Sequence, residues 1–429
     1  MMVQTVIKRV ARWALTRQSE YSFEARVPEV EERVHSMSEL GLYLHIPFCR
    51  QICPYCPYNK QIFNPETALA YADALIREID IYSSKIGSIP ITSLYIGGGT
   101  PTTMLDHGLE RIIEHVYGSF NMRCGIHMES HPKDLTLGNL ARLRAMGIDY
   151  LSIGVEALQD HHLRTLGRSY TADHVKHVMK LAKQIGFHCV NADLIFALPN
   201  QTLEELEEAG RTLVELGMDQ VAAYPLFTFP YTAWPSIVRR NGHKTASVFT
   251  KRKMLAALES VFYGAGYRRT SVWAFTKAGV EKYCSVTVPQ YVGLGASAGS
   301  YLKDVLYFNT FNVDAYIHAL NSGRRPIALS MDLSPRMQRA GWLYWRIYET
   351  NFKLTDFQKR FGMGFRRVYG IYFKLFSLFG LVKEHTNRIV LSDRGAYWLH
   401  VLQDLFSIDY VSELWGASRR DPWPSRVVL

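Results

Sequence analysis

Short apolar stretches alternate with amphipathic ones along residues 41 to 227. The apolar stretches carry little charge, as strands buried in a parallel sheet do. In chain order they are Gly41–Pro47, Ser93–Ile96, Gly125–Glu129, Tyr150–Val155, Cys189–Phe196 and Val221–Phe227. The stretches between them have apolar residues at helical spacing and are Thr67–Ile86, Gly108–Tyr117, Leu135–Met146, Ala172–Ile185 and Leu203–Leu216. This alternation predicts a parallel α/β architecture.

Glycines and polar side chains gather at the ends of these predicted strands. A cysteine-rich loop follows the first strand, and a glycine run follows the second. Glu129 and Glu156 end the third and fourth strands, Asp193 lies within the fifth, and Phe227 ends the sixth. Since the carboxyl ends of strands in such folds open at one mouth, the pattern predicts a single site there.

The pattern changes after Pro230. Val248–Tyr263 has the spacing of a helix, and Trp273–Phe275 is expected to lie in a loop. The glycine-rich segment Tyr291–Tyr301 has two readings. Its glycines let the backbone approach a ligand closely, or they merely turn the chain.

Residues 334 to 407 have the pattern of a small, mainly helical unit. The predicted elements are the helices Arg336–Thr350, Thr355–Phe361 and Phe365–Phe379, a hairpin at Leu381–Leu391 and a helix from Ser392. The tail after Tyr410 is predicted to be extended. The predicted division is an N-terminal extension (1–40), the strand–helix core (41–230), a completing segment with the glycine-rich return (231–325), and a C-terminal domain with its tail (326–429).

Composition and charge narrow the function classes only slightly. The chain has 429 residues and a net charge of +10, and most of the excess lies in residues 321–429. That excess is compatible with an anionic substrate, a membrane surface, nucleic acid or a solvated basic face. No apolar run is long enough to span a membrane. The six cysteines do not suggest a disulfide framework, and a reducing cytoplasm is expected.

The N-terminal segment Met1–Gln18 is basic and loosely amphipathic. It lacks the uninterrupted apolar region and the cleavage site of a secretion signal. It could lie on a membrane surface, but a helix packed against the domain is the favoured reading.

Three cysteines, Cys49, Cys53 and Cys56, stand close together in one loop. Structural zinc sites usually take four protein ligands, and no fourth cysteine or histidine at zinc-finger spacing lies nearby. Ferredoxin-type runs also supply four thiolates. A trio without a fourth ligand therefore predicts an iron–sulfur cubane with one open iron.

The surrounding motifs resemble the radical S-adenosylmethionine (SAM) superfamily. Within it they look like the oxygen-independent coproporphyrinogen III dehydrogenase family, which includes decarboxylases, haem chaperones and class C methyltransferases. The motifs are Tyr43-x-His45-Ile-Pro-Phe, the cysteine trio, Gly97–Thr102, Gly154-Val155-Glu156 and Leu166-Gly167-Arg168. The resemblance implies a partial (β/α)6 TIM-type barrel with a small C-terminal domain of winged-helix character.

The resemblance also implies cofactors and residue roles. The cysteine trio would hold a 4Fe–4S cluster whose open iron binds SAM, and a donor such as flavodoxin or ferredoxin would supply electrons. The matching SAM positions are Tyr43, Tyr55, Gly98, Gly99, Thr100 and Glu129, with Phe227 and Gly299 as further contacts. Glu156, Arg168 and Asp193 match positions that hold a second SAM. Tyr55 and Glu156 are the residues expected to take part in catalysis.

Two positions depart from the family pattern. Pro57-Tyr58 stands where the dehydrogenase branch has another cysteine, which favours the chaperone and methyltransferase branches. Glu156 replaces the usual glutamine, and a carboxylate there could oppose the positive charge of a sulfonium. His45 and His131 lie near the mouth, and a structural role is expected for both.

The leading hypothesis is a radical SAM enzyme that cleaves SAM to methionine and a 5′-deoxyadenosyl radical. A second SAM would then methylate an unactivated carbon of a hydrophobic or aromatic substrate. A haem-binding chaperone and an oxidative tetrapyrrole decarboxylase are the alternatives, so the small-molecule partner is a tetrapyrrole or another hydrophobic or anionic compound. Basic helices beside a wing could bind DNA, but the apolar helix Phe365–Phe379 suits packing, and nucleic-acid binding is not expected.

Overall fold

The computed structural model describes residues 16–18, 20–35, 37–283 and 290–429. Most of the segment Met1–Gln18, and Cys284, lie outside these residues. No helix in the described ranges is long and apolar enough to cross a bilayer.

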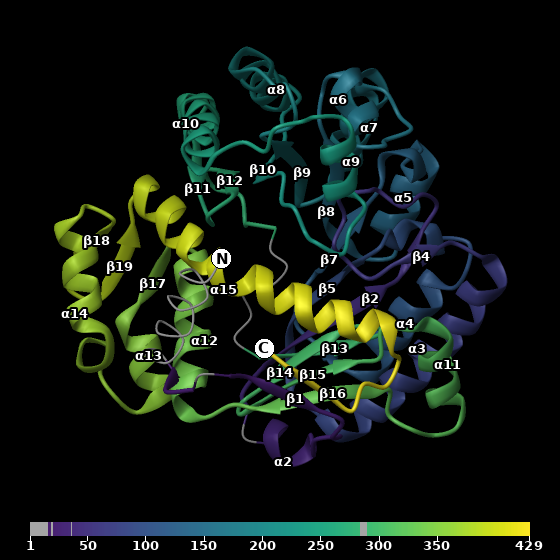
Figure 1. Cartoon of the computed structure of the whole chain (residues 1–429). Coiled ribbons are helices and arrows are strands. Elements are labelled where there is room, and N and C mark those ends of the chain that lie inside the picture. Colours follow the sequence, from purple (N-terminus) through teal and green to yellow (C-terminus); the bar gives the residue numbers. More distant parts are fainter. Residues whose placement is uncertain (1–15, 19, 36, 284–289) are drawn as a thin grey trace.

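Six parallel strands form the centre of the molecule, as predicted (Figure 1). Each strand pairs in parallel with the next one along the chain. They are β2 (Leu40–Ile46), β5 (Pro90–Gly98), β7 (Ile126–Ser130), β8 (Ile148–Glu156), β9 (Cys189–Phe196) and β10 (Gln220–Pro225). Most of their buried side chains are aliphatic, which is why these strands could be predicted from composition.

Helices cover the outer face of these strands in Figure 1. They are α3 (Pro65–Ile86), α4 (Leu109–Ser119), α5 (Leu137–Ala145), α6 (Asp160–Thr165), α7 (Ala172–Ile185) and α8 (Leu203–Glu215). The buried residues of α7 are Ala172, Val175, Val178, Met179 and Ala182, one stripe at helical spacing. Five of these helices lie where they were predicted.

The sheet is larger than the six predicted strands. Beyond β10 lie the antiparallel strands β12 (Ala274–Lys277) and β11 (Tyr267–Arg269). The prediction of a loop at Trp273–Phe275 is therefore wrong for its last two residues. These residues are buried against the barrel edge, where β12 satisfies the free backbone groups of β10.

The glycine-rich segment forms two strands that continue the sheet beyond β2. β13 (Tyr291–Leu294) pairs in parallel with β2, and an antiparallel series follows. That series is β14 (Gly299–Leu302), β15 (Val305–Asn309), β16 (Ile327–Asp332), β1 (Ser22–Glu24) and β20 (Arg426–Val428). Residues near both ends of the described chain thus meet in one sheet.

The C-terminal elements have their own hydrophobic cluster, around Trp342, Phe357, Phe365 and Phe373. They are α12 (Pro335–Tyr348), α13 (Leu354–Phe361), α14 (Phe365–Leu378) and the three-stranded sheet of β17 (Asn351–Lys353), β19 (Arg388–Leu391) and β18 (Val382–His385). The predicted helices and hairpin are confirmed in position.

Helix α15 (Asp393–Arg420) runs from the C-terminal elements back across the molecule (Figure 1). The prediction of an extended tail after Tyr410 is therefore wrong up to Arg420. Leu414 is buried against Phe23 and Phe311, and this packing fixes the helix where local pattern gave no signal.

The remaining elements are short connections or covers. They are α2 (Glu31–Val34), β3 (Phe48–Cys49), β4 (Gln61–Ile62), a 3-10 turn at Pro101–Met104, β6 (Asn121–Met122), a 3-10 turn at Pro132–Asp134, α9 (Trp234–Arg240), α10 (Val248–Gly264) and α11 (Val313–Asn321).

Candidate functional site

A cavity of about 470 Å³ lies at the carboxyl ends of the parallel strands. Most residues predicted to form the site line it. They are Cys49, Cys53, Tyr55, Cys56, Gly98, Gly99, Thr100, Glu129, Glu156, Arg168, Asp193 and Phe227. Phe227 lies just beyond the end of β10 rather than within it.

A second cavity of about 240 Å³ adjoins the first. The two remaining predicted residues, Tyr43 and Gly299, line this smaller space. Tyr58, Tyr95, Gly98 and Glu129 line both cavities, so the two spaces share a wall. The fold thus brings every predicted site residue to one connected region, while the roles of these residues stay predictions.

The three cysteine thiols face the larger cavity from β3 and the loop after it. Thr100 donates a hydrogen bond to Cys49 Sγ over 3.4 Å. Burial raises the pKa of Cys49 to about 11 and raises that of Cys53 as well. The thiols of Cys49 and Cys53 therefore hold their protons at neutral pH, and metal binding must release them.

The spacing of the three sulfur atoms does not fit one preformed zinc site. A zinc ion bound by thiolates at about 2.3 Å places those sulfurs roughly 3.8 Å apart. Among the described residues, the three sulfurs do not all lie within 4.8 Å of one another. A wider spacing suits a cluster in which each thiolate binds a different iron.

Close packing is enough to explain why residues 98 and 99 are glycines. Gly98 has a φ of +114°, and a Cβ there would lie 2.4 Å from the His45 ring. A Cβ at Gly99 would lie 2.7 Å from the carbonyl oxygen of Phe48. The amide N–H groups of residues 98–100 already donate within the protein. These amides are therefore not available to a ligand.

Glu129 is held only by uncharged donors. Tyr95 Oη donates to one carboxylate oxygen over 2.5 Å, and the Gly98 N–H donates to the other over 2.9 Å. Tyr283 donates in turn to Tyr95 over 2.7 Å. Burial raises the pKa of Glu129, and the two donors oppose that shift. No cation of the described residues pairs with this carboxylate.

Glu156, by contrast, forms a buried ion pair with Arg168. It ends β8 at an irregular pairing with β9, and its φ of +63° is rare for a residue other than glycine. Arg168 also donates to Tyr55 Oη over 2.6 Å. Burial raises the pKa of Glu156, and the guanidinium opposes that shift. The carboxylate expected to oppose a sulfonium is already neutralised by the protein.

Asp193 is a buried carboxyl group with two hydrogen-bond donors beside it. Ser152 Oγ donates to it over 2.6 Å and Asn191 Nδ2 over 2.9 Å. Burial raises the pKa of Asp193 to about 7, and the two hydrogen bonds oppose that shift. This carboxyl group therefore faces the cavity partly protonated near neutral pH.

His45 has contacts typical of a structural histidine. Its Nδ1 lies 2.7 Å from Tyr43 Oη and its Nε2 lies 3.0 Å from the Asn59 carbonyl oxygen. Burial lowers the pKa of His45 to about 4, so the ring is neutral. Nε2 therefore donates to the carbonyl, and Nδ1 accepts from Tyr43.

Sequence reasoning missed the part of the cavity lining that the C-terminal helices supply, called the C-terminal wall below. The C-terminal helices α12 and α15 supply Tyr344, Tyr348, His400, Asp404 and Val411 to the lining. Trp273 and Tyr283 complete the aromatic part of the surface. These residues lie far from the motifs in sequence, and no local pattern marks them.

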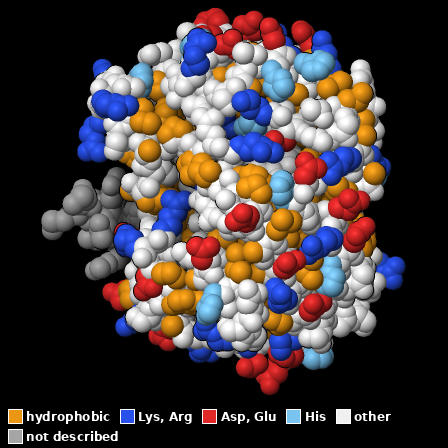
Figure 2. Space-filling model, turned by 90° about the vertical axis from the view of Figure 1, so that its right-hand side faces the viewer, with side chains coloured by type: hydrophobic (Ala, Val, Ile, Leu, Met, Phe, Trp, Pro, Cys, Tyr) orange, Lys and Arg blue, Asp and Glu red, His pale blue; other side chains and the backbone are white. Residues whose placement is uncertain are grey.

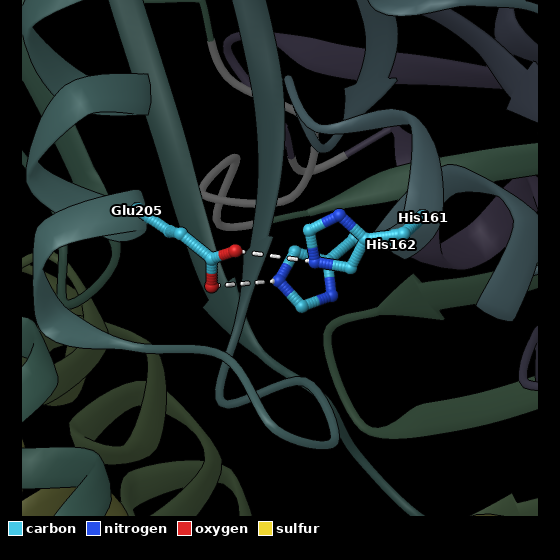
Figure 3. Close-up of side chains that lie close together, drawn as sticks. All are labelled: His161, His162 and Glu205. Atoms are coloured by element: carbon cyan, nitrogen blue, oxygen red, sulfur yellow. Dashed lines mark hydrogen bonds and ion pairs between the residues drawn. The ribbon is translucent and has the colours of Figure 1, made fainter.

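One further group of potential metal ligands occurs in the described part of the chain. Figure 3 shows the two oxygens of Glu205, each pointing toward the Nε2 atom of one histidine, His161 or His162, at 3.2 Å. Glu205 also closes the capping box of α8 with Thr202. His162 Nδ1 has no hydrogen-bond partner, whereas a metal-bound histidine almost always donates from its second nitrogen. The group acts as a clamp between α6 and α8.

Comparison with known proteins agrees with this geometry. Residues 43–213 match the model of the Radical SAM superfamily. The chain is 26% identical to the haem chaperone HemW of Bacillus subtilis over 82% of its own length and 95% of that protein. It is 25% identical to the oxygen-independent coproporphyrinogen III oxidase of Pseudomonas aeruginosa, over 86% of this chain and 85% of the relative.

One solved structure has the same fold over nearly the whole chain. Coproporphyrinogen III oxidase (HemN) from Escherichia coli superposes with a TM-score of 0.76 at 22% identity. The match covers 90% of this chain and 94% of that one.

Proposed function

Because this chain is a radical SAM protein of the HemN/HemW type, we propose that it binds SAM at a 4Fe–4S cluster, cleaves it reductively, and holds a haem-like tetrapyrrole in the same cavity. The observation that carries the proposal is that three kinds of binding group lie around the same cavity. Three thiols, the carboxylate of Glu129, which pairs with no cation in the described part of the chain, and a ring-lined wall meet around one cavity.

The donor set fits the proposed cluster. Three soft thiolates suit iron–sulfur centres, and Cys49, Cys53 and Cys56 would hold the cluster while leaving one iron without a protein ligand. When bound, the cluster supplies the electron that cleaves the carbon–sulfur bond of SAM. The thiols must first lose their protons, so cluster assembly becomes easier as pH rises.

Glu129 and Asp193 give the cavity its affinity for a cationic, hydroxyl-bearing cofactor. Glu129 keeps acceptor capacity because its two neutral donors use only part of it. A carboxylate accepts hydrogen bonds from ribose hydroxyls and attracts a sulfonium. Tyr95 and Gly98 keep the Glu129 side chain oriented toward this ligand.

The ring-lined wall suits a large flat ligand. Tyr348, Tyr224, Phe227 and Trp273 present apolar surface to the larger cavity, beside the polar cysteine loop. Pockets lined by rings with a few polar groups are typical of sites for cofactor-sized molecules. The names of the similar proteins, a haem chaperone and a coproporphyrinogen oxidase, support a tetrapyrrole here.

The small number of lysines and arginines at the larger cavity favours haem binding over decarboxylation of a substrate with several propionates. Lys60, Arg168 and Lys282 are the lysines and arginines that line the larger cavity in the described residues. Arg168 is paired with Glu156, and Lys282 with Glu349. Lys60 forms no ion pair within the described residues, although its Nζ donates to the carbonyl oxygens of Cys56 and Tyr58, so it is the remaining cation that can bind a carboxylate. Since coproporphyrinogen carries more carboxylates than haem does, the cavity is better suited to haem.

Methyl transfer with two SAM molecules receives less support. No relative reported above is named as a methyltransferase. The charge argument for a second SAM also weakens, because Glu156 is paired with Arg168. An external electron donor such as flavodoxin or ferredoxin remains part of the proposal, since the chain needs a source of single electrons.

The test is anaerobic reconstitution followed by two measurements. Reduced protein is incubated with SAM, with and without haem, and 5′-deoxyadenosine is quantified. The same protein is titrated with haem and followed by absorbance. We expect 5′-deoxyadenosine and one haem per chain. Haem binding without SAM cleavage would reject the enzymatic part, and cleavage without haem binding would reject the tetrapyrrole part.

A further inference from the structure

Helix α14 has an unusual exposed apolar face. Five large apolar or aromatic side chains on or next to it are exposed: Ile371 (69%), Tyr372 (41%), Leu375 (49%), Leu378 (79%) and Phe379 (65%). They recur at helical spacing, so they lie together on one side. A monomeric protein rarely leaves such a continuous apolar patch in water unless something binds it.

The opposite side of α14 is anchored. Phe365, Tyr369 and Phe373 are buried in the cluster of the C-terminal elements. The exposed face therefore cannot turn inward without breaking that cluster. Figure 1 places α14 at the outer edge of the molecule, far from the parallel strands, so the face does not serve the cavity.

Positive charge borders the apolar side chains. Arg367 and Lys374 are exposed on the same helix, and neither forms an ion pair with any carboxylate in the described ranges. The helix contains no Asp or Glu at all. Apolar residues beside Lys and Arg are the pattern of a helix that lies in the plane of an anionic membrane surface.

The surface over the barrel helices differs from the exposed face of α14. Figure 2 shows the side of the molecule over the barrel helices, where Lys and Arg alternate with Asp and Glu and hydrophobic side chains are scattered. Other exposed large hydrophobic residues, such as Leu69 and Leu137, lie on separate helices. Single exposed side chains of this kind need no explanation.

We propose that α14 docks this protein on an anionic phospholipid surface. Charge complementarity favours an anionic bilayer over a second copy of this chain as the partner of α14. In a symmetric dimer through α14, the cations of one copy would face those of the other, with no carboxylate on the helix to offset them. An anionic bilayer offers negative headgroups to Arg367 and Lys374, and an apolar layer to Leu375, Leu378 and Phe379.

Vesicle co-sedimentation of the full chain tests the proposal. Vesicles of phosphatidylcholine are compared with vesicles containing phosphatidylglycerol, at low and high salt. The variants are Leu375→Glu/Leu378→Glu and Arg367→Glu/Lys374→Glu, and Leu137→Glu on α5 is the control with a matched exposed leucine. Size-exclusion chromatography of each variant reports the oligomeric state, and circular dichroism reports folding.

We expect binding to the anionic vesicles that weakens at high salt, with Leu137→Glu behaving as the wild type. Both α14 variants should weaken it at least about tenfold, because each removes several contacts of the helix with the bilayer. Failure to bind anionic vesicles at low salt would overturn the proposal, as would equal binding by all variants. A wild-type dimer that the α14 variants convert to monomer, without vesicle binding, would assign the face to a second copy instead.

Discussion

The two walls of the main cavity come from different parts of the chain and carry different chemistry. The barrel wall presents thiols and carboxylates at strand ends, including Cys49 and Glu129, while the C-terminal wall presents Tyr344, Tyr348 and Val411. All three cluster thiols therefore lie on the barrel wall, whereas rings contribute to both walls and the C-terminal wall also carries His400 and Asp404. We infer that the barrel wall determines the cofactor chemistry and that the C-terminal wall selects the second ligand.

Charge also varies within the barrel wall. Glu156 is neutralised by Arg168, whereas the partners of Glu129 and Asp193 among the described residues are all uncharged. A buried carboxylate with a guanidinium partner contributes to the fold, and one without such a partner is available to a ligand. Variants of these carboxylates should therefore separate stability from binding.

The largest effect is expected from breaking the ion pair. Glu156→Gln leaves the Arg168 guanidinium buried without its charged partner, which should lower the free energy of unfolding by about 3 kcal/mol. Arg168→Gln in the same background should restore part of the loss, because no isolated charge remains. Denaturant unfolding of the cluster-free proteins measures both. Equal stability of the single variant and the wild type would show that the pair is not structural.

Asp193 should make stability depend on pH. Its folded pKa of about 7 lies above its ordinary value of 3.8, so the folded state holds the proton more tightly than the unfolded chain. Between those two pH values unfolding releases this proton, and the group's contribution to stability should fall with rising pH by up to about 1.4 kcal/mol per pH unit.

Asp193→Asn removes that contribution. The difference in unfolding free energy between the wild type and the variant should therefore change steadily from pH 4 to pH 7. A difference that is independent of pH across this window would contradict the raised pKa.

Glu129→Gln should weaken SAM binding by about tenfold, the value of one charge-assisted contact of about 1.4 kcal/mol. The iron content should not change, because Glu129 is not a cluster ligand. Calorimetric titration of SAM into reconstituted protein gives the affinity, with the exposed Glu110→Gln as control. Wild-type affinity in Glu129→Gln would remove this residue from the SAM site.

The smallest effect is expected on the C-terminal wall. Tyr348→Leu should weaken haem binding by about three- to tenfold through lost ring contact, while the rate of 5′-deoxyadenosine formation stays unchanged. Tyr117→Leu, at an exposed position of α4, is the control. If Tyr348→Leu lowers SAM cleavage and leaves haem affinity intact, the assignment of the two walls is reversed.

The residues of the barrel wall could be predicted from sequence because each motif lies next to its strand along the chain. Each buried parallel strand is a short apolar run, and each motif follows one strand directly. The site residues from Cys49 to Asp193 could therefore be assigned to one mouth before any contact was known. The glycines of residues 97–99 could be predicted for the same reason, although packing against His45 and Phe48 accounts for Gly98 and Gly99 without a ligand.

The C-terminal wall could not be predicted because its position depends on contacts between residues far apart in the sequence. Helix α15 extends to Arg420 through burial of Leu414 against Phe23, a residue almost at the other end of the chain. The ion pair of Glu156 with Arg168 likewise forms only because α6 and the turn after it bring Arg168 back to the end of β8. Neither contact leaves a trace in local residue spacing.

The central claim is that Cys49, Cys53 and Cys56 hold one cluster that cleaves SAM, and iron content with product formation tests it most directly. The wild type, Cys49→Ser/Cys53→Ser/Cys56→Ser and the control Cys124→Ser are reconstituted anaerobically and reduced. The wild type and the control should hold about four irons per chain and form 5′-deoxyadenosine, whereas the triple variant should hold none and form none. Full iron retention with SAM cleavage in the triple variant would contradict the account.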